Sequence, residues 1–225
     1  MKKISDHVKI GSIEEMQKTL NNSLNEYELF AKVLWESHFL EEGARVFPNI
    51  IRCINRQLNI LKVSPSLPLE VADGACRTVF EVYIRTKLIT DQPELIRDFF
   101  IERVFEEISI LKSFKRLAHE ETPSSVIGVL DSRLKEIGDY ISKYQLKKPQ
   151  VLSSFKLAEA AELDDEYKTL YGFYSKYTHG SAWLVNAKDE ERDGDGYRII
   201  FTAQTQVYAE STVQHIREYY NKIKG

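Results

Sequence analysis

The side chains best suited to chemistry are concentrated in Tyr167–His179, with the sequence YKTLYGFYSKYTH. At about 3.6 residues per helical turn, Tyr171, Ser175 and His179 recur every fourth residue and form one line on a helix, with Tyr174 beside it. Buried hydroxyl groups cost free energy unless they are hydrogen-bonded. This face therefore either meets polar groups inside the fold or lines a binding site.

A second polar line crosses an otherwise apolar segment, ACRTVFEVYIR. It consists of Asp73, Arg77, Glu81 and Arg85, which alternate in sign at every fourth residue. Two interpretations are open for it. The line is either a solvent-facing stripe of weak ion pairs, or it places Arg77 and Glu81 inside the bundle, where charges must be paired.

We expect the two lines to meet across a pair of helices, because arginine supplies only donors, glutamate only acceptors, and hydroxyl groups complement both. The contact is then a structural network or a site. A site would have His179 and Arg77 as candidate catalytic residues. Its candidate binding residues are Glu81, Tyr171, Tyr174 and Ser175.

Composition limits the possible partners. The 225 residues contain 31 Lys+Arg and 34 Asp+Glu, a net charge of -3, so no overall field attracts nucleic acid or an anionic membrane. The N-terminus lacks the apolar region of a secretory signal, and no run is long enough to span a membrane. Cys53 and Cys76 are expected to be reduced core residues. The expected compartment is the cytoplasm.

Several motifs are absent from the sequence. It contains neither a P-loop nor a dinucleotide-binding glycine pattern, and no Cys-x-x-Cys or His-Glu-x-x-His. No histidine follows a glutamate by three residues, as a di-iron bundle requires. The sequence therefore predicts no cofactor and no metal site.

Apolar residues spaced three and four apart predict a mainly all-α, multi-helix bundle. Ser12 and Glu15 form a capping box at the first helix, and Gly43 and Gly180 are expected to end helices. Asp91 is expected to cap the fourth helix. The predicted helices cover residues 12–42, 48–62, 67–90, 91–119, 124–144, 153–161, 164–179 and 205–224.

One segment has the composition of strands rather than helix. Residues 182–187 and 197–203 are rich in β-branched and aromatic residues and flank the polar run KDEERDGDG. They predict a β-hairpin over residues 182–203, packed on the helices as a small appendage. No repeat or linker divides the chain, so we expect a single domain over residues 1–225.

The helix ACRTVFEVYIRTKLI and the later AEAAELDDEYKTLYGFYSKYTHGS resemble a family of uncharacterised, largely bacterial helical proteins that pair an Arg-x-x-x-Glu helix with a Tyr, Ser and His helix. The matching positions are Arg77, Glu81, Tyr171, Ser175 and His179. More widely, the chain is similar to HEPN helical bundles, many of which are RNases or nucleotide-binding partners in toxin, defence and stress systems. HEPN ribonucleases carry an arginine, then four to six residues, then the histidine on one helix, whereas the corresponding positions before His179 are Gly172, Phe173 and Tyr174.

Three hypotheses follow. The first, implied by the resemblance, is a HEPN-like binding or interaction module of a defence or stress system, acting through a partner protein, RNA or a nucleotide. The second is a metal-independent RNase with His179 as general acid or base and Arg77 stabilising phosphoryl charge. The third is a structural homodimer without a small-molecule site. The missing arginine favours a protein that is not an enzyme.

Overall fold

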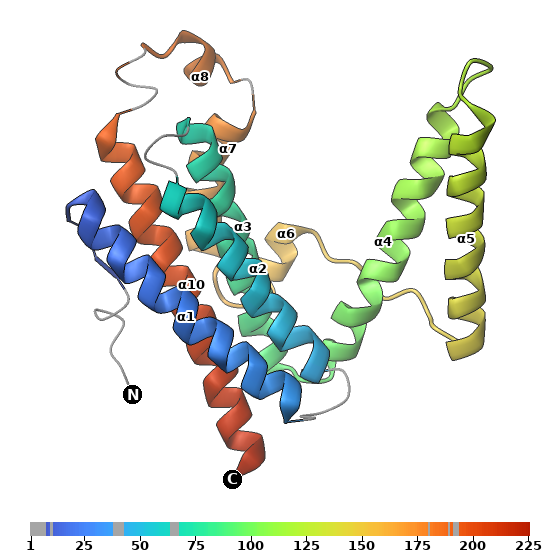
Figure 1. The fold of residues 1–225 in the computed structure, drawn as a ribbon, viewed down its shortest axis with the longest axis horizontal. Coiled ribbons are helices and arrows are strands. Elements are labelled where there is room, and N and C mark those ends of the chain that lie inside the picture. The colour runs from blue at the N-terminus through green and yellow to red at the C-terminus, as the bar shows by residue number, and fades with distance from the viewer. Residues whose placement is uncertain are drawn as a thin grey trace. The chain divides into compact units, whose positions relative to one another are not determined.

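The computed structural model describes residues 8–9, 11–37, 43–63, 68–179, 181–188, 190 and 194–225 (Figure 1). Over these ranges the regular elements are all helices, which confirms the predicted all-α class. The helices are α1 (Ile13–Glu36), α2 (Gly43–Val63), α3 (Leu69–Asp91), α4 (Leu95–Leu117), α5 (Ser124–Tyr144), α6 (Ser154–Ala160), α7 (Asp164–Thr178), α8 (Ala182–Asn186) and α10 (Asp195–Lys224).

The chain forms two compact units. The core unit comprises Met1–Pro93 and Leu152–Gly225, and the hairpin unit comprises Glu94–Val151. None of the helices described is long and apolar enough to cross a membrane.

Helix α3 is the centre of the core unit and packs against α2, α6, α7 and, most extensively, α10. The reason lies in its sequence, which is apolar on nearly every side. Buried residues therefore recur along its whole length, from Leu69 to Ile89. Because α3 is covered on several sides, charged residues along it lie close to neighbouring helices.

The first two helices confirm the capping box and correct two boundaries. Ser12 accepts a hydrogen bond from the Glu15 backbone and the Glu15 side chain accepts one from the Ser12 backbone. Helix α1 ends at Glu36, short of the predicted residue 42, and residues 38–42 lie outside the described ranges. Gly43 begins α2 instead of ending α1, and Pro48 lies inside α2 instead of starting it.

The predicted β-hairpin over residues 182–203 is wrong. Residues 182–186 form α8, and residues 197–203 belong to α10. The buried positions Phe201, Thr205 and Ala209 recur every fourth residue, so this segment continues the periodicity of the last helix and packs on α3. Burial against α3 outweighs the weak local strand preference of YRIIF. Part of the predicted loop lies outside the described residues.

Helix α7, which carries the hydroxyl-rich line, has nearly its predicted bounds. Gly180, which was expected to end it, lies outside the described residues. Asp91 is the last residue of α3 and does not cap α4, which begins at Leu95. The Asp91 side chain instead reaches back one turn to Lys87, 3.5 Å away.

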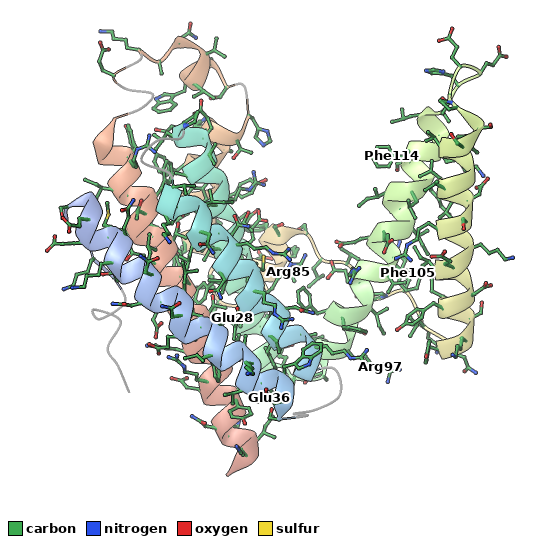
Figure 2. All side chains as sticks on the ribbon, in the orientation of Figure 1. Glu28, Glu36, Arg85, Arg97, Phe105 and Phe114 are labelled. Carbon is green, nitrogen blue, oxygen red and sulfur yellow. The ribbon has the colours of Figure 1, made fainter. Side chains whose placement is uncertain are left out.

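The hairpin unit consists of α4 and α5. The two helices are joined by two ion pairs, Lys115–Asp131 at 2.5 Å and Arg133–Glu107 at 2.6 Å. Few of its side chains are buried, as Figure 2 illustrates for Phe114 at the surface of α4. The buried residues of the two helices are Ile96, Ile101 and Ile137.

Candidate functional site

Helices α3 and α7 bring three of the predicted site residues together. Arg77 donates from Nε to Glu81 Oε1 at 3.0 Å and from Nη2 to the Tyr171 hydroxyl at 2.9 Å. The Arg77 Cζ also lies 4.5 Å from the centroid of the Tyr171 ring. The guanidinium is therefore fixed by one carboxylate and one aromatic residue.

The Arg77–Glu81 pair lies at the boundary between core and solvent. The Arg77 side chain keeps 21% of its surface accessible and that of Glu81 keeps 35%. Burial lowers the pKa of Arg77, but the hydrogen bond and charge of Glu81, with Tyr171, outweigh it and raise the pKa overall. Both interpretations of the polar line of α3 are therefore partly met. The Arg77–Glu81 pair is a partly exposed ion pair within one helix, and Arg77 also reaches Tyr171 of the neighbouring helix α7.

Aromatic packing positions the Tyr171 hydroxyl. Its ring stacks on Tyr167 with centroids 4.8 Å apart and planes 18° apart. The Tyr167 ring in turn contacts Phe80 of α3 at 6.4 Å and Phe155 of α6 at 6.0 Å. Three helices therefore hold the ring against which Arg77 lies.

One turn before Arg77, Asp73 is fully buried, with 0% of its surface accessible. Its Oδ2 accepts a hydrogen bond from the Thr178 hydroxyl at 2.8 Å, whereas Oδ1 has no hydrogen-bond partner among the described residues. Burial raises the pKa of Asp73 to about 7, against the lowering effects of Thr178 and Arg77 and with a further rise from Glu70. Asp73 therefore changes charge near neutral pH.

Two other buried oxygens without hydrogen bonds lie near Asp73. They are Glu70 Oε2 on α3 and the Tyr177 hydroxyl on α7. Burial raises the pKa of Tyr177, and the charges of Asp73 and Glu70 raise it further, as does Tyr197. We call these residues, together with those described above, the α3–α7 polar cluster: Glu70, Asp73, Arg77, Glu81, Tyr171, Tyr177 and Thr178.

Tyr174 lies in the core, where its hydroxyl group links three helices. It is fully buried, its hydroxyl oxygen accepts a hydrogen bond from the Cys76 thiol at 3.4 Å, and the hydroxyl donates to Gln204 Oε1 at 3.1 Å. These contacts tie α3, α7 and α10 together. The predicted binding residue Tyr174 thus lies in the core, where its hydroxyl group is already hydrogen-bonded within the fold.

Ser175 and His179 do not join this cluster. The Ser175 hydroxyl donates to the Gly172 carbonyl of its own helix at 2.9 Å. His179 directly follows α7 and is exposed. Within the described part of the chain, no hydrogen bond or ion pair links the His179 side chain to Arg77. A histidine proton donor and an arginine charge stabiliser are therefore not assembled at one point.

Sequence reasoning missed the roles of two acidic residues. Asp73 belonged to the predicted polar line, but its burial came from the packing of α7 and could not be inferred from spacing. Glu210 of α10 is also fully buried, and accepts a hydrogen bond from the Tyr27 hydroxyl at 2.6 Å, with Arg217 Nη1 3.5 Å away. The spacing of Glu210 and Arg217, seven residues apart, was the one available signal for this pair.

Comparison with known proteins yields one match. The model of a family of unknown function, DUF5677, matches residues 70–195, which is more than half of the chain. The matched region includes α7, all of α3 but its first residue, and thus the whole α3–α7 polar cluster. No curated protein and no solved structure matches the chain.

Proposed function

The chain belongs to the DUF5677 family of unknown function, and we propose that it is a HEPN-like helical binding module that contacts a partner protein through the α3–α7 polar cluster. We place it in the cytoplasm, in a bacterial defence or stress system. The resemblance of its Arg-x-x-x-Glu helix and Tyr, Ser and His helix to such proteins supports this setting. The free thiols of Cys53 and Cys76 are consistent with a reducing compartment.

The observation that carries the proposal is the group of buried oxygens without hydrogen bonds: Asp73 Oδ1, Glu70 Oε2 and the Tyr177 hydroxyl. Each buried polar group without a partner costs about 1–3 kcal/mol of stability. Local costs of this kind are typical of functional sites, where the missing partner is supplied by a ligand.

The chemistry of the cluster indicates what that partner presents. Two of the three oxygens belong to carboxyl groups, and carboxylates accept hydrogen bonds. Glu70, Asp73 and Glu81 are opposed by Arg77 alone among the cluster residues, so acidic residues are in excess and ionisation of Asp73 increases that excess. A guanidinium or ammonium group of a partner protein supplies both donors and the compensating charge.

The alternative hypothesis of an RNase is less well supported. Acid–base cleavage of RNA needs a proton-transfer group and a cation at the same phosphate. His179 is exposed beyond the end of α7, and Arg77 is already engaged by Glu81 and Tyr171. We therefore expect no RNA cleavage by the purified chain in EDTA, and no difference between the wild type and His179→Ala.

A pair of small probes tests the proposed contact. N-acetyl-arginine amide, but not the neutral isostere N-acetyl-citrulline amide, is expected to raise the melting temperature at millimolar concentration. The effect should be larger at pH 8 than at pH 6, because the Asp73 carboxyl, with a pKa of about 7, ionises between them. The other charged groups near Asp73 are Glu70 and Arg77 of its own helix, and Tyr177 and Thr178 face it from α7.

The matched variants are Asp73→Asn, which keeps the hydrogen bond with Thr178 but removes the charge, and Asp139→Asn, an exposed aspartate of α5. Asp73→Asn should abolish the arginine-specific shift, measured from its own baseline, and Asp139→Asn should retain it. Equal shifts with the two probes, or an unchanged shift in Asp73→Asn, would refute the proposed contact.

A further inference from the structure

The hairpin unit leaves large apolar side chains in solvent on both of its helices. On α4, Phe114 is 58% and Leu117 76% exposed, and Ile110 lies on the same face. On α5, Val129 is 68% exposed. The other exposed apolar residues of α5 are Val126, Tyr140 and Tyr144. Apolar patches of this kind on a helix pair are typical of interfaces.

The exposed residues of the two helices lie on one side of the hairpin. Arg133 of α5 reaches Glu107 of α4 at 2.6 Å, so these two residues lie along one edge of the contact between the two helices. Ile110 and Phe114 follow Glu107 by three and seven residues, and Val129 precedes Arg133 by four. Residues at these spacings share a helix face. We call this side of α4 and α5 the hairpin face.

Two charged residues without a close ion pair among the described residues lie in the α4 part of this face, and the charge of the first, Arg103, also contributes to lowering the pKa of Glu107 one turn further on. Arg103 and Glu106 are exposed, one helical turn apart, and aligned with Ile110 and Phe114. Among the described residues, neither makes a hydrogen bond or ion pair. Along the face, the half-buried Phe99 precedes one cation and one anion, and the exposed apolar residues follow.

The order of these residues along α4 makes the helix complementary to a second, antiparallel copy of itself. If two copies of α4 pack antiparallel about a two-fold axis between residues 104 and 105, Arg103 of each copy meets Glu106 of the other. Phe99 then meets the partner's Ile110, so apolar residues meet apolar residues. Acidic and basic residues are equal in number over residues 94–151, so no net repulsion opposes the contact.

We propose that the hairpin face binds the hairpin face of a second copy of this chain, forming an antiparallel four-helix bundle that makes the protein a homodimer. The contact buries the apolar residues that one hairpin cannot cover by itself. The two reciprocal Arg103–Glu106 pairs set its register. This surface is independent of the α3–α7 polar cluster, so either proposal can fail without the other.

The test is the molar mass of the full chain in solution, measured by sedimentation equilibrium. We expect twice the chain mass of 26.1 kDa at micromolar concentrations. Phe114→Asp, at an exposed position that leaves the core untouched, should weaken the dimer by at least about tenfold in Kd. Lys135→Asp is the matched control, because this exposed residue of α5 follows Val129 by six residues and therefore lies on another side of the helix; it should change the Kd by less than about threefold.

Charge exchange tests the register. Arg103→Glu and Glu106→Arg should each weaken self-association by about tenfold, because like charges then meet across the axis. A mixture of the two variants should form a heterodimer with near wild-type affinity, because each variant then meets opposite charges. Rescue in the mixture cannot come from contacts within one chain.

Three results would overturn the proposal. The first is a wild-type chain that is monomeric at tens of micromolar. The second is a dimer that is unaffected by Phe114→Asp in a variant whose circular dichroism is unchanged. The third is the absence of a heterodimer in the mixture of Arg103→Glu and Glu106→Arg.

Discussion

At the scale of single residues, two buried carboxyl groups differ in how their environments satisfy them. Glu210 accepts hydrogen bonds from Tyr27 and Gln214 and has Arg217 beside it, so its charge is compensated inside the core. Asp73 accepts a hydrogen bond from the Thr178 hydroxyl on one oxygen, and no described residue donates to the other. The first arrangement links α1 to α10, whereas the second costs stability and is the reason for assigning a binding role to α3 and α7.

Asp73 therefore predicts a pH-dependent stability difference. An unfolded aspartate has a pKa of about 3.9, whereas that of Asp73 in the fold is about 7. Between these values the folded protein holds a proton that the unfolded chain has released, so this contribution to the free energy of unfolding falls as pH rises from about 4 to about 7. Asp73→Asn removes the titration. We expect the variant to be the more stable form above pH 7, by up to about 4 kcal/mol.

Urea unfolding followed by circular dichroism from pH 4.5 to 8.5 measures this difference. The quantity to compare is the free energy of unfolding of Asp73→Asn minus that of the wild type at each pH. It should grow with pH up to about 7 and then level off. Asp139→Asn, at an exposed position, should give a small and constant difference. A constant difference for Asp73→Asn as well would mean that Asp73 is ionised throughout the range.

At the scale of elements, α10 shows how packing overrides local preference. Its first two turns contain YRIIF, which is typical of a strand, yet the Phe201 ring contacts the rings of Phe173 and Tyr177 of α7, with centroids 5.1 Å from each. Ile200, its neighbour, is exposed. The helix continues upstream because the same face that packs on α3 also packs on α7.

This packing predicts opposite outcomes for two adjacent substitutions. Phe201 has 0% of its surface exposed, and we expect Phe201→Ala to destabilise the fold by about 3–5 kcal/mol. Ile200→Ala should be neutral or stabilising by a few tenths of a kcal/mol, because alanine is the better helix former. Denaturant unfolding measures both. A clear loss of stability in Ile200→Ala would instead favour an extended segment.

At the scale of the whole molecule, the two units differ in how much side-chain surface they bury. Buried residues extend along the whole of α3, whereas α4 and α5 together bury Ile96, Ile101 and Ile137. A unit with so few buried contacts has little to oppose local opening. A single domain over residues 1–225 stays a prediction.

Hydrogen exchange measures this difference in local stability. In Arg103→Glu, diluted so that self-association does not contribute, the central amides of α4 and α5 should exchange at least about tenfold faster than those of α3. In the wild type, exchange in α4 and α5 should slow as concentration rises, because dimerisation stabilises the hairpin. Exchange in α3 is the internal control. Equal protection of α3, α4 and α5 would contradict the expected difference in local stability between the two units.

The sequence by itself determined most of the helices and one contact between them. The capping box at Ser12, the bounds of α5 and α7, and the meeting of Arg77 with Tyr171 all follow from spacing along the chain. Such features depend on residues within a few turns of one another, or on the most polar faces of otherwise apolar helices. Both are visible in a one-dimensional pattern.

Only the tertiary structure decided which polar groups are buried and what they lack. Asp73 and Glu210 look like ordinary members of charged helix lines, and their burial depends on neighbours about 100 to 180 residues away, Thr178 and Tyr27. The helical state of residues 197–203 was likewise decided by distant packing. Burial is a property of the assembled fold, since a side chain loses its water only when other helices cover it.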